Sequence, residues 1–171
     1  LANLIALGLM IARLQWTGSL EAGTAIANLA AVRILVGTTF CCAVIAPAHE
    51  LLHRRSRWQR WLGRLMLITV FNDRFSTAHR LGHHARLGRR EDPSTAAPDE
   101  SYEAFFRRSL RRQWVLAWQR QPRSMALGLW LESALLGVYI VAFGGLAAFM
   151  LCYVNRVAVR LLEAVNYFQH F

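Results

Sequence analysis

The chain has 171 residues, which is enough for one domain. It is 55% hydrophobic, yet its formal net charge is +10, because all 20 basic residues are arginine. Sixteen of these arginines lie between positions 54 and 123. This combination is typical of a membrane protein with one charged side. It argues against a nucleic-acid-binding protein, which would be basic without such long apolar runs.

The N-terminal part of the chain predicts a helical hairpin in a membrane. Residues 1–15 predict the end of one membrane helix, and residues 17–23 predict a polar turn. Residues 24–48 are apolar for about 25 positions except at Arg33. At ~1.5 Å per residue this length crosses a hydrocarbon core of about 30 Å. We expect Arg33 to face protein rather than lipid, and we expect the natural polypeptide to begin before Leu1, which already lies in an apolar run.

The basic middle of the chain, residues 49–123, is predicted to be cytoplasmic because arginine is concentrated there. Within it, residues 61–75 predict a short interfacial or re-entrant helix, and residues 88–100 predict a polar loop. Residues 101–120 predict an arginine-rich amphipathic helix at the membrane surface. Its expected membrane anchors are aromatic: Tyr102, Phe105, Phe106, Trp114 and Trp118.

The C-terminal part predicts a second hairpin. It is apolar for some thirty positions apart from Glu132, and Gly144 and Gly145 stand where a turn is needed. This places spans at about 124–143 and 146–168. The predicted fold class is therefore all-α, a polytopic membrane helix bundle with a cytoplasmic histidine-rich metal site. We expect one domain over residues 1–171, truncated at both ends.

The cysteines predict no disulfide framework, because all of them lie in apolar stretches without a CxxC spacing. We interpret them as small apolar residues: Cys41, Cys42 and Cys152.

Two histidine clusters lie in or beside the basic region. The first is HELLH, residues 49–53, in which His49 and His53 lie on one helix face and can share a metal. The second is HRLGHH, residues 79–84. On an α-helix His79 and His83 share a face, whereas His84 points about 100° away and could reach a second ion.

The spacing of these histidines therefore suits two adjacent metal ions. Gly82 lets the backbone come close at the second cluster. Imidazole binds iron, zinc, copper and nickel, so the spacing leaves the element open. For any single histidine the alternative is a structural, hydrogen-bonded residue.

The last predicted helix carries a polar stripe that ends at His170. A turn at Gly144 returns this helix to the cytoplasmic side, where His170 meets the other histidines. Arg160 and Glu163 are natural partners, and Glu163 could equally bind a metal or support a metal-binding histidine. The stripe could also simply stabilise the bundle. Its members recur at steps of three or four: Arg156, Arg160, Glu163, Asn166 or Tyr167, and His170.

HELLH also matches the HExxH pattern of zinc peptidases, in which the glutamate, here Glu50, is the general base. A membrane metallopeptidase is therefore an alternative. It is less favoured because it leaves His79, His83 and His84 without a role.

Four stretches in the same order resemble the integral-membrane alkane 1-monooxygenases, which belong to the membrane fatty-acid desaturase and hydroxylase superfamily. They are HELLHRR, HRLGHHARLGRREDPSTA, SYEAFFRRSL and LLEAVNYFQHF. The resemblance runs from about residue 45 to the end of the chain. It implies a helical protein of the bacterial inner membrane, with two non-haem iron ions at its cytoplasmic face.

By this resemblance the protein uses O₂, and electrons from a rubredoxin, to hydroxylate the terminal carbon of an alkane or similar apolar chain. The arginine-rich face suits an acidic electron carrier by its charge alone. The implied iron ligands are His49, His53, His79, His83, His84 and His170. Supporting positions around them are assigned to Glu50, Glu163 and Asn166, and no proton-transfer residue is identified.

The resemblance is incomplete at two positions. Ala78 and Gln169 stand where the family usually has glutamate, and we expect a further HxxHH box beyond Phe171. These departures leave two alternatives open. One is a fatty-acid or lipid desaturase or hydroxylase of the same superfamily, and the other is an inactive fragment with residual metal sites.

Overall fold

The computed structural model describes residues 2–16, 28, 36–87, 89 and 91–169. The regular elements among these residues are all helices, which confirms the all-α prediction. The predictions for Arg33, His170 and the turn at 17–23 lie outside the described residues.

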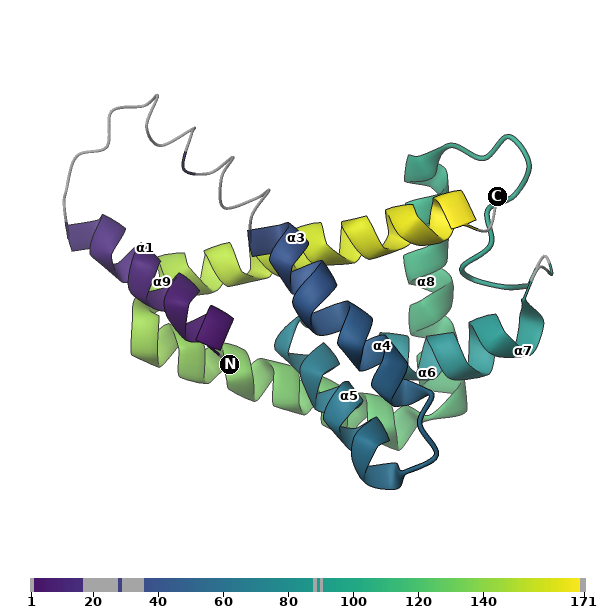
Figure 1. Ribbon diagram of the computed structural model, residues 1–171, viewed down its shortest axis with the longest axis horizontal. Coiled ribbons are helices and arrows are strands. Elements are labelled where there is room, and N and C mark those ends of the chain that lie inside the picture. The colour runs from purple at the N-terminus through teal and green to yellow at the C-terminus, as the bar shows by residue number, and fades with distance from the viewer. Residues whose placement is uncertain (1, 17–27, 29–35, 88, 90, 170–171) are drawn as a thin grey trace.

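Three apolar helical segments pack together (Figure 1). They are α1 (Ala2–Trp16), a continuous helix over residues 37–52, and α9 (Pro122–Gln169). The second comprises α3 (Gly37–Phe40), a π-helical turn (Cys41–Ile45) and α4 (Ala46–Leu52). Tyr139 of α9 donates a hydrogen bond of 3.0 Å to the carbonyl of Leu4 in α1. The fully buried side chains of this core include Phe40, Ile45, Leu151 and Val154.

The long helix α9 is broken at Gly144, as the sequence predicts. Gly144 has φ 83° and ψ 170°, far from helical values, in a region that is essentially reserved for glycine. The chain reverses direction there, so that α9 consists of two helical halves joined at a bend. The first and last residues of α9 both lie far from this bend (Figure 1).

Replacing Gly144 with alanine is expected to destabilise the protein by about 1–3 kcal/mol through backbone strain. A Cβ at Gly144 would meet nothing within 4 Å, so steric crowding adds nothing. Gly137 offers a matched control, since it has the same open surroundings inside the helix. There alanine should be neutral or stabilising by up to about 1 kcal/mol. Unfolding of both variants in detergent, followed by circular dichroism, checks this, and equal stabilities would contradict it.

The predicted short helix at 61–75 is instead two helices with a corner between them. α5 (Arg57–Thr69) ends before Phe71, which has φ 53°, and α6 (Arg74–Ala78) then begins. Asp73 holds the corner, because it accepts two hydrogen bonds from Arg64, at 2.7 and 2.8 Å. Its backbone N–H donates to Glu132 of α9. The corner therefore depends on contacts with α9 that helix periodicity cannot reveal.

The predicted helix at 101–120 is present as α8 (Tyr102–Arg120) and begins at Ser101, whose side chain accepts from the N–H of Ala104. Its predicted role as an aromatic membrane anchor is wrong at two positions. Phe105 and Phe106 are 0% and 3% exposed, because they lie on the face that packs inside the protein.

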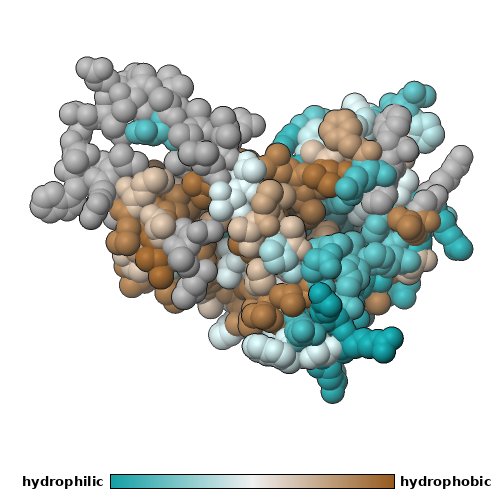
Figure 2. All heavy atoms as spheres, viewed as in Figure 1, coloured by the Kyte–Doolittle hydropathy of each residue, from teal (hydrophilic) through white to brown (hydrophobic). Residues whose placement is uncertain are grey.

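The surface separates into apolar and polar ends. On the face shown in Figure 2, hydrophobic residues gather over α1 and the bend of α9, and hydrophilic residues gather over α6 and the segment after it. Within the described chain, α9 is the one helix long and apolar enough to cross a membrane, and residues 37–52 form a shorter apolar helix. The three cysteines are free thiols.

Candidate metal centre

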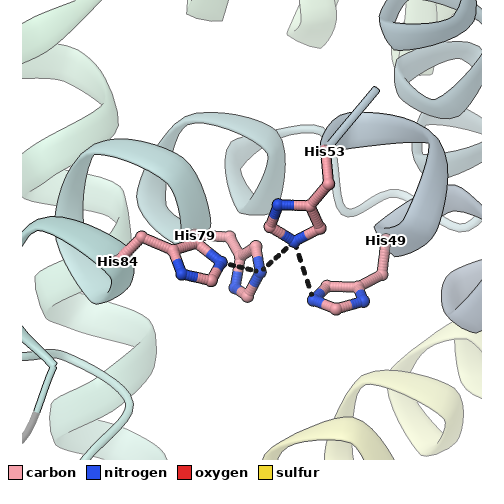
Figure 3. Close-up of side chains that lie close together, drawn as sticks. All are labelled: His49, His53, His79 and His84. Atoms are coloured by element: carbon pink, nitrogen blue, oxygen red, sulfur yellow. Dashed lines mark hydrogen bonds between the residues drawn. The ribbon is translucent and has the colours of Figure 1, made fainter. Parts of the chain in front are cut away.

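Four histidine side chains converge between α4 and the segment that follows α6 (Figure 3). His49 belongs to α4 and His53 caps its C-terminus, which confirms that they share a helix face. The Nε2 atoms of His49 and His53 lie 3.2 Å apart, and those of His53 and His79 also lie 3.2 Å apart. His84 Nε2 is 2.8 Å from His79 Nε2. One ring nitrogen from each of the four lies within 4.8 Å of all the others.

This arrangement fits a metal ion better than a hydrogen-bond network. Each facing nitrogen offers either one N–H or one lone pair, whereas the Nε2 atoms of His53 and His79 each face two neighbours, so hydrogen bonds alone cannot satisfy all three contacts well. Nitrogens bound at ~2.1 Å from one ion lie roughly 3 Å apart, which matches the observed separations of 2.8–3.2 Å. The donor set, all imidazole, suits iron, zinc, copper or nickel.

The surroundings favour the neutral form of three of these imidazoles, the form that binds metals. Burial, followed by the charges of the neighbouring histidines, lowers the pKa of His79 to about 2. Burial and the nearby His53 also lower the pKa values of His49 and His84. At neutral pH these three side chains can therefore offer lone pairs to a cation.

In the second cluster His79 and His83 lie side by side as predicted, with ring centroids 5.4 Å apart and an angle of 24°. The prediction that His84 points away from them is wrong. Residues His79–His83 form a π-helical turn rather than an α-helical one, followed by α7 (His84–Arg86). The wider turn brings residue i+5, His84, to the ring nitrogen of His79. A Cβ at Gly82 would lie 2.7 Å from the Cδ2 atom of Leu116 in α8, so an alanine there would require the Leu116 side chain to move.

His83 is directed to a carboxylate that the sequence interpretation missed. Its Nδ1 lies 2.9 Å from Asp92 Oδ2, and both side chains are buried. Burial raises the pKa of Asp92, but hydrogen bonds from His83, Ser94 and Thr95 outweigh it and lower that pKa. The carboxylate is therefore ionised and only accepts, which puts a proton of His83 on Nδ1 and makes Nε2 the nitrogen that would bind a metal. The sequence feature that could have indicated this partner is Asp92 itself, an acidic residue before Pro93 and close to the histidine box.

Replacing Asp92 with asparagine should weaken metal binding about 10–100-fold, the usual effect of losing a carboxylate that orients a ligand histidine. Asp99 is a matched control, because it is exposed in the same loop. Competition with a coloured ferrous-iron chelator measures both variants. Equal iron retention by the Asp92→Asn and Asp99→Asn proteins would contradict the role of Asp92.

Glu50 lies on the outer side of the first cluster. Its carboxylate is 3.6 Å from His49 Nδ1 and 69% exposed, whereas His49 meets the other histidines through Nε2. A peptidase general base must reach a water on the metal side. Glu50 is therefore better placed to orient His49 than to act as the general base of a peptidase.

The predicted pairing of Arg160 with Glu163 is wrong. Arg160 pairs with Glu103 of α8. Glu163, 0% exposed, accepts from Ser109 Oγ at 2.8 Å and Gln113 Nε2 at 2.7 Å. The reason is that α8 packs against the last helix and supplies partners for its polar face.

Asn166, on the same stripe, is half-buried. Its Nδ2 atom has no hydrogen-bond partner among the described residues.

Comparison with known proteins places the chain in a family. The fatty acid desaturase family model matches residues 24–171. Alkane 1-monooxygenase 1 of Pseudomonas aeruginosa is 31% identical over 80% of this chain and 39% of its own length. Alkane 1-monooxygenase 2 of the same organism is 28% identical over 80% of this chain and 40% of its own.

Alkane 1-monooxygenase 1 of Alcanivorax borkumensis is 29% identical over 72% of this chain and 34% of its own length. The chain thus spans 34–40% of the length of these three relatives. With a histidine cluster at the boxes that carry the likeness, the chain belongs to the fatty acid desaturase family as an alkane monooxygenase-like member.

Proposed function

We propose that this protein is an integral-membrane, non-haem di-iron monooxygenase that hydroxylates the terminal carbon of alkanes or similar apolar chains. The observation that carries the proposal is the convergence of four imidazole nitrogens in a chain whose relatives are named alkane 1-monooxygenases. Lipid desaturation or hydroxylation by the same centre is the alternative reaction.

The six histidines divide into two groups for this role, and the structure describes all of them but His170. His49, His53, His79 and His84 are proposed to bind one iron, which their convergence supports. His83, oriented by Asp92, and His170 are proposed as ligands of the second iron. When bound, the irons supply the reduction of O₂ and the oxidation of the C–H bond.

The protein fixes and shields His79, the buried member of the cluster, whereas His49 is half-buried and His53 and His84 are exposed. Phe75, 2% exposed, stacks on His79 with ring centroids 4.8 Å apart and an angle of 18°. Its ring excludes water from one side of the cluster and fixes the plane of the imidazole. Fixed ligands hold an ion without reorganisation, and exclusion of water protects a reactive centre.

The proposed topology has spans at about 1–15, 24–48, 124–143 and 146–168, with residues 49–123 and the metal site facing the cytoplasm of a bacterial inner membrane. The apolar bend of α9 and the polar opposite end support it. Cysteine labelling in intact cells tests it on a cysteine-free background. An impermeant maleimide should label a cysteine at Gly145 but not one at Asp99, and the reverse pattern would contradict the topology.

An arginine groove on α8 supports docking of an acidic, rubredoxin-type electron donor. The groove encloses about 900 Å³, and Arg86, Arg107 and Arg111 line it. Pro93 and Leu116, which also line it, are the side chains that approach Gly82 between the histidines. A donor seated there would be separated from Gly82 by Pro93 and Leu116, and charge complementarity favours rapid association.

The function is tested with the full-length protein in membranes, supplied with a rubredoxin, its reductase, a medium-chain alkane and ¹⁸O₂. We expect a terminal alcohol that contains ¹⁸O, and none from the His79→Ala protein. A new double bond in an acyl lipid, without alcohol from the alkane, would instead support the desaturase alternative.

A further inference from the structure

A second basic pocket lies between α5, α6 and the start of α9, separate from the arginine groove. It encloses about 350 Å³. Four arginines line it and none of its lining residues is acidic. Arginine guanidinium groups bind phosphate through paired hydrogen bonds. The arginines are Arg57, Arg60, Arg64 and Arg80.

Two of these arginines are already engaged, and two are not. Arg64 binds Asp73, and Arg60 donates to the carbonyls of Arg54 and Arg55 at 3.0 and 2.6 Å. Arg57 and Arg80 are exposed, and neither makes an ion pair or hydrogen bond with a residue that the structure describes. Arg60 and Arg64 are therefore held in place as part of the pocket lining, whereas Arg57 and Arg80 provide positive charge that no acidic side chain among the described residues neutralises.

Polar side chains complete the lining. Gln121 accepts from Thr77 through Oε1, at 3.1 Å, which leaves its NH₂ group as a donor. Ser76 lines the same pocket, but its hydroxyl donates to the carbonyl of Asp73 at 2.7 Å. The pocket therefore combines two cationic groups with one neutral donor, the NH₂ group of Gln121, a set suited to a phosphate diester.

Exposed aromatic and aliphatic side chains place the pocket at an interface. Trp58 and Trp61 of α5 are 68% and 45% exposed, and the Arg64 guanidinium lies 5.2 Å from the Trp61 ring centroid. Leu127 and Trp130, 40% and 66% exposed, follow in the first turns of α9, where its apolar run begins. Tryptophan beside arginine at the start of an apolar helix is typical of the headgroup layer of a membrane.

We propose that this pocket binds the phosphate headgroup of an anionic phospholipid from the cytoplasmic leaflet, with Arg57 and Arg80 as its principal ligands. The inference rests on the proposed membrane orientation. The acyl chains lie against the exposed tryptophans, and the bound lipid fixes the depth of α5 beside the α5–α6 corner that leads to the histidines.

Native mass spectrometry of the full chain in detergent tests the site with phosphatidylglycerol and phosphatidylcholine as probes. We expect one phosphatidylglycerol to bind more tightly than phosphatidylcholine. An arginine that contacts an anionic headgroup contributes roughly fivefold to binding, so Arg57→Gln with Arg80→Gln should weaken the complex about 25-fold. Arg54→Gln with Arg55→Gln, which removes equal charge beside the pocket, should leave the affinity unchanged.

Three results would overturn the proposal. One is equal loss in both double variants, which would indicate a general charge effect. Another is complete displacement of the lipid by millimolar inorganic phosphate, which would make the ligand free phosphate. The third is unchanged affinity after Arg57→Gln with Arg80→Gln. The Arg57→Lys, Arg80→Lys protein keeps the charge and should recover part of the affinity, which separates lost binding from misfolding.

The measurement involves no turnover. Tight phosphatidylglycerol binding in a protein without alkane hydroxylation would refute the proposed function alone, and normal hydroxylation without lipid selectivity would refute the lipid site alone.

Discussion

The His79→Ala protein is expected to lose iron almost completely. The Nε2 atom of His79 is the centre of the cluster, 3.2 Å from that of His53 and 2.8 Å from that of His84. Its removal takes away the one buried ligand of the four and leaves His49, His53 and His84, of which two are exposed to water that can compete for the ion. Iron per chain in the purified protein, measured by plasma mass spectrometry, checks this.

Phe75→Leu is the matched control for that variant. Phe75 stacks on His79 and is equally buried, so its truncation disturbs the same packing without removing a ligand. We expect Phe75→Leu to lower stability by about 1 kcal/mol, as hydrophobic exchanges in a core do, while iron is retained. Loss of iron in both proteins would indicate that packing, rather than the imidazole, holds the metal.

The Asp73→Ala protein is expected to lose about 3–5 kcal/mol of folding free energy, the effect of leaving one member of a buried ion pair without its partner. Arg64 and Asp73 have side chains that are 12% and 2% exposed, and two hydrogen bonds join them. The corner between α5 and α6 depends on this pair. The free energy of unfolding in detergent measures the effect.

An exposed ion pair in the same protein is the control. Arg160 and Glu103 have side chains that are 34% and 51% exposed, so Glu103→Ala should cost at most about 1 kcal/mol, because water screens the pair. If Asp73→Ala costs no more than Glu103→Ala, the corner is held by something other than the buried ion pair.

Helix periodicity, glycine conformation and helix capping were sufficient to predict those features of the structure that depend on a single segment of the chain. The four-residue spacing of His49 and His53 put both rings on one side of a single helix. The conformation of Gly144 follows from its missing side chain, so the break in α9 could be predicted from the apolar run around it. The helix at 101–120 likewise begins at a residue, Ser101, that caps it locally.

Contacts between segments determined the features of the structure that could not be predicted from the sequence. The π-helical turn at His79–His83 rearranges the second box, and the buried partner of His83 comes from a loop nine positions away. Phe106, predicted as a membrane anchor, is buried because α8 packs inward. Glu163 binds α8 instead of its own neighbour Arg160.

The sequence by itself therefore determined the helices, the basic middle region and the residue types of a metal site. These depend on periodicity, composition and spacing, which are properties of one segment. Only the tertiary structure decided which nitrogens meet and which carboxylate orients a histidine. Such choices depend on the position of a second segment, whose distance along the chain carries no information about its distance in space.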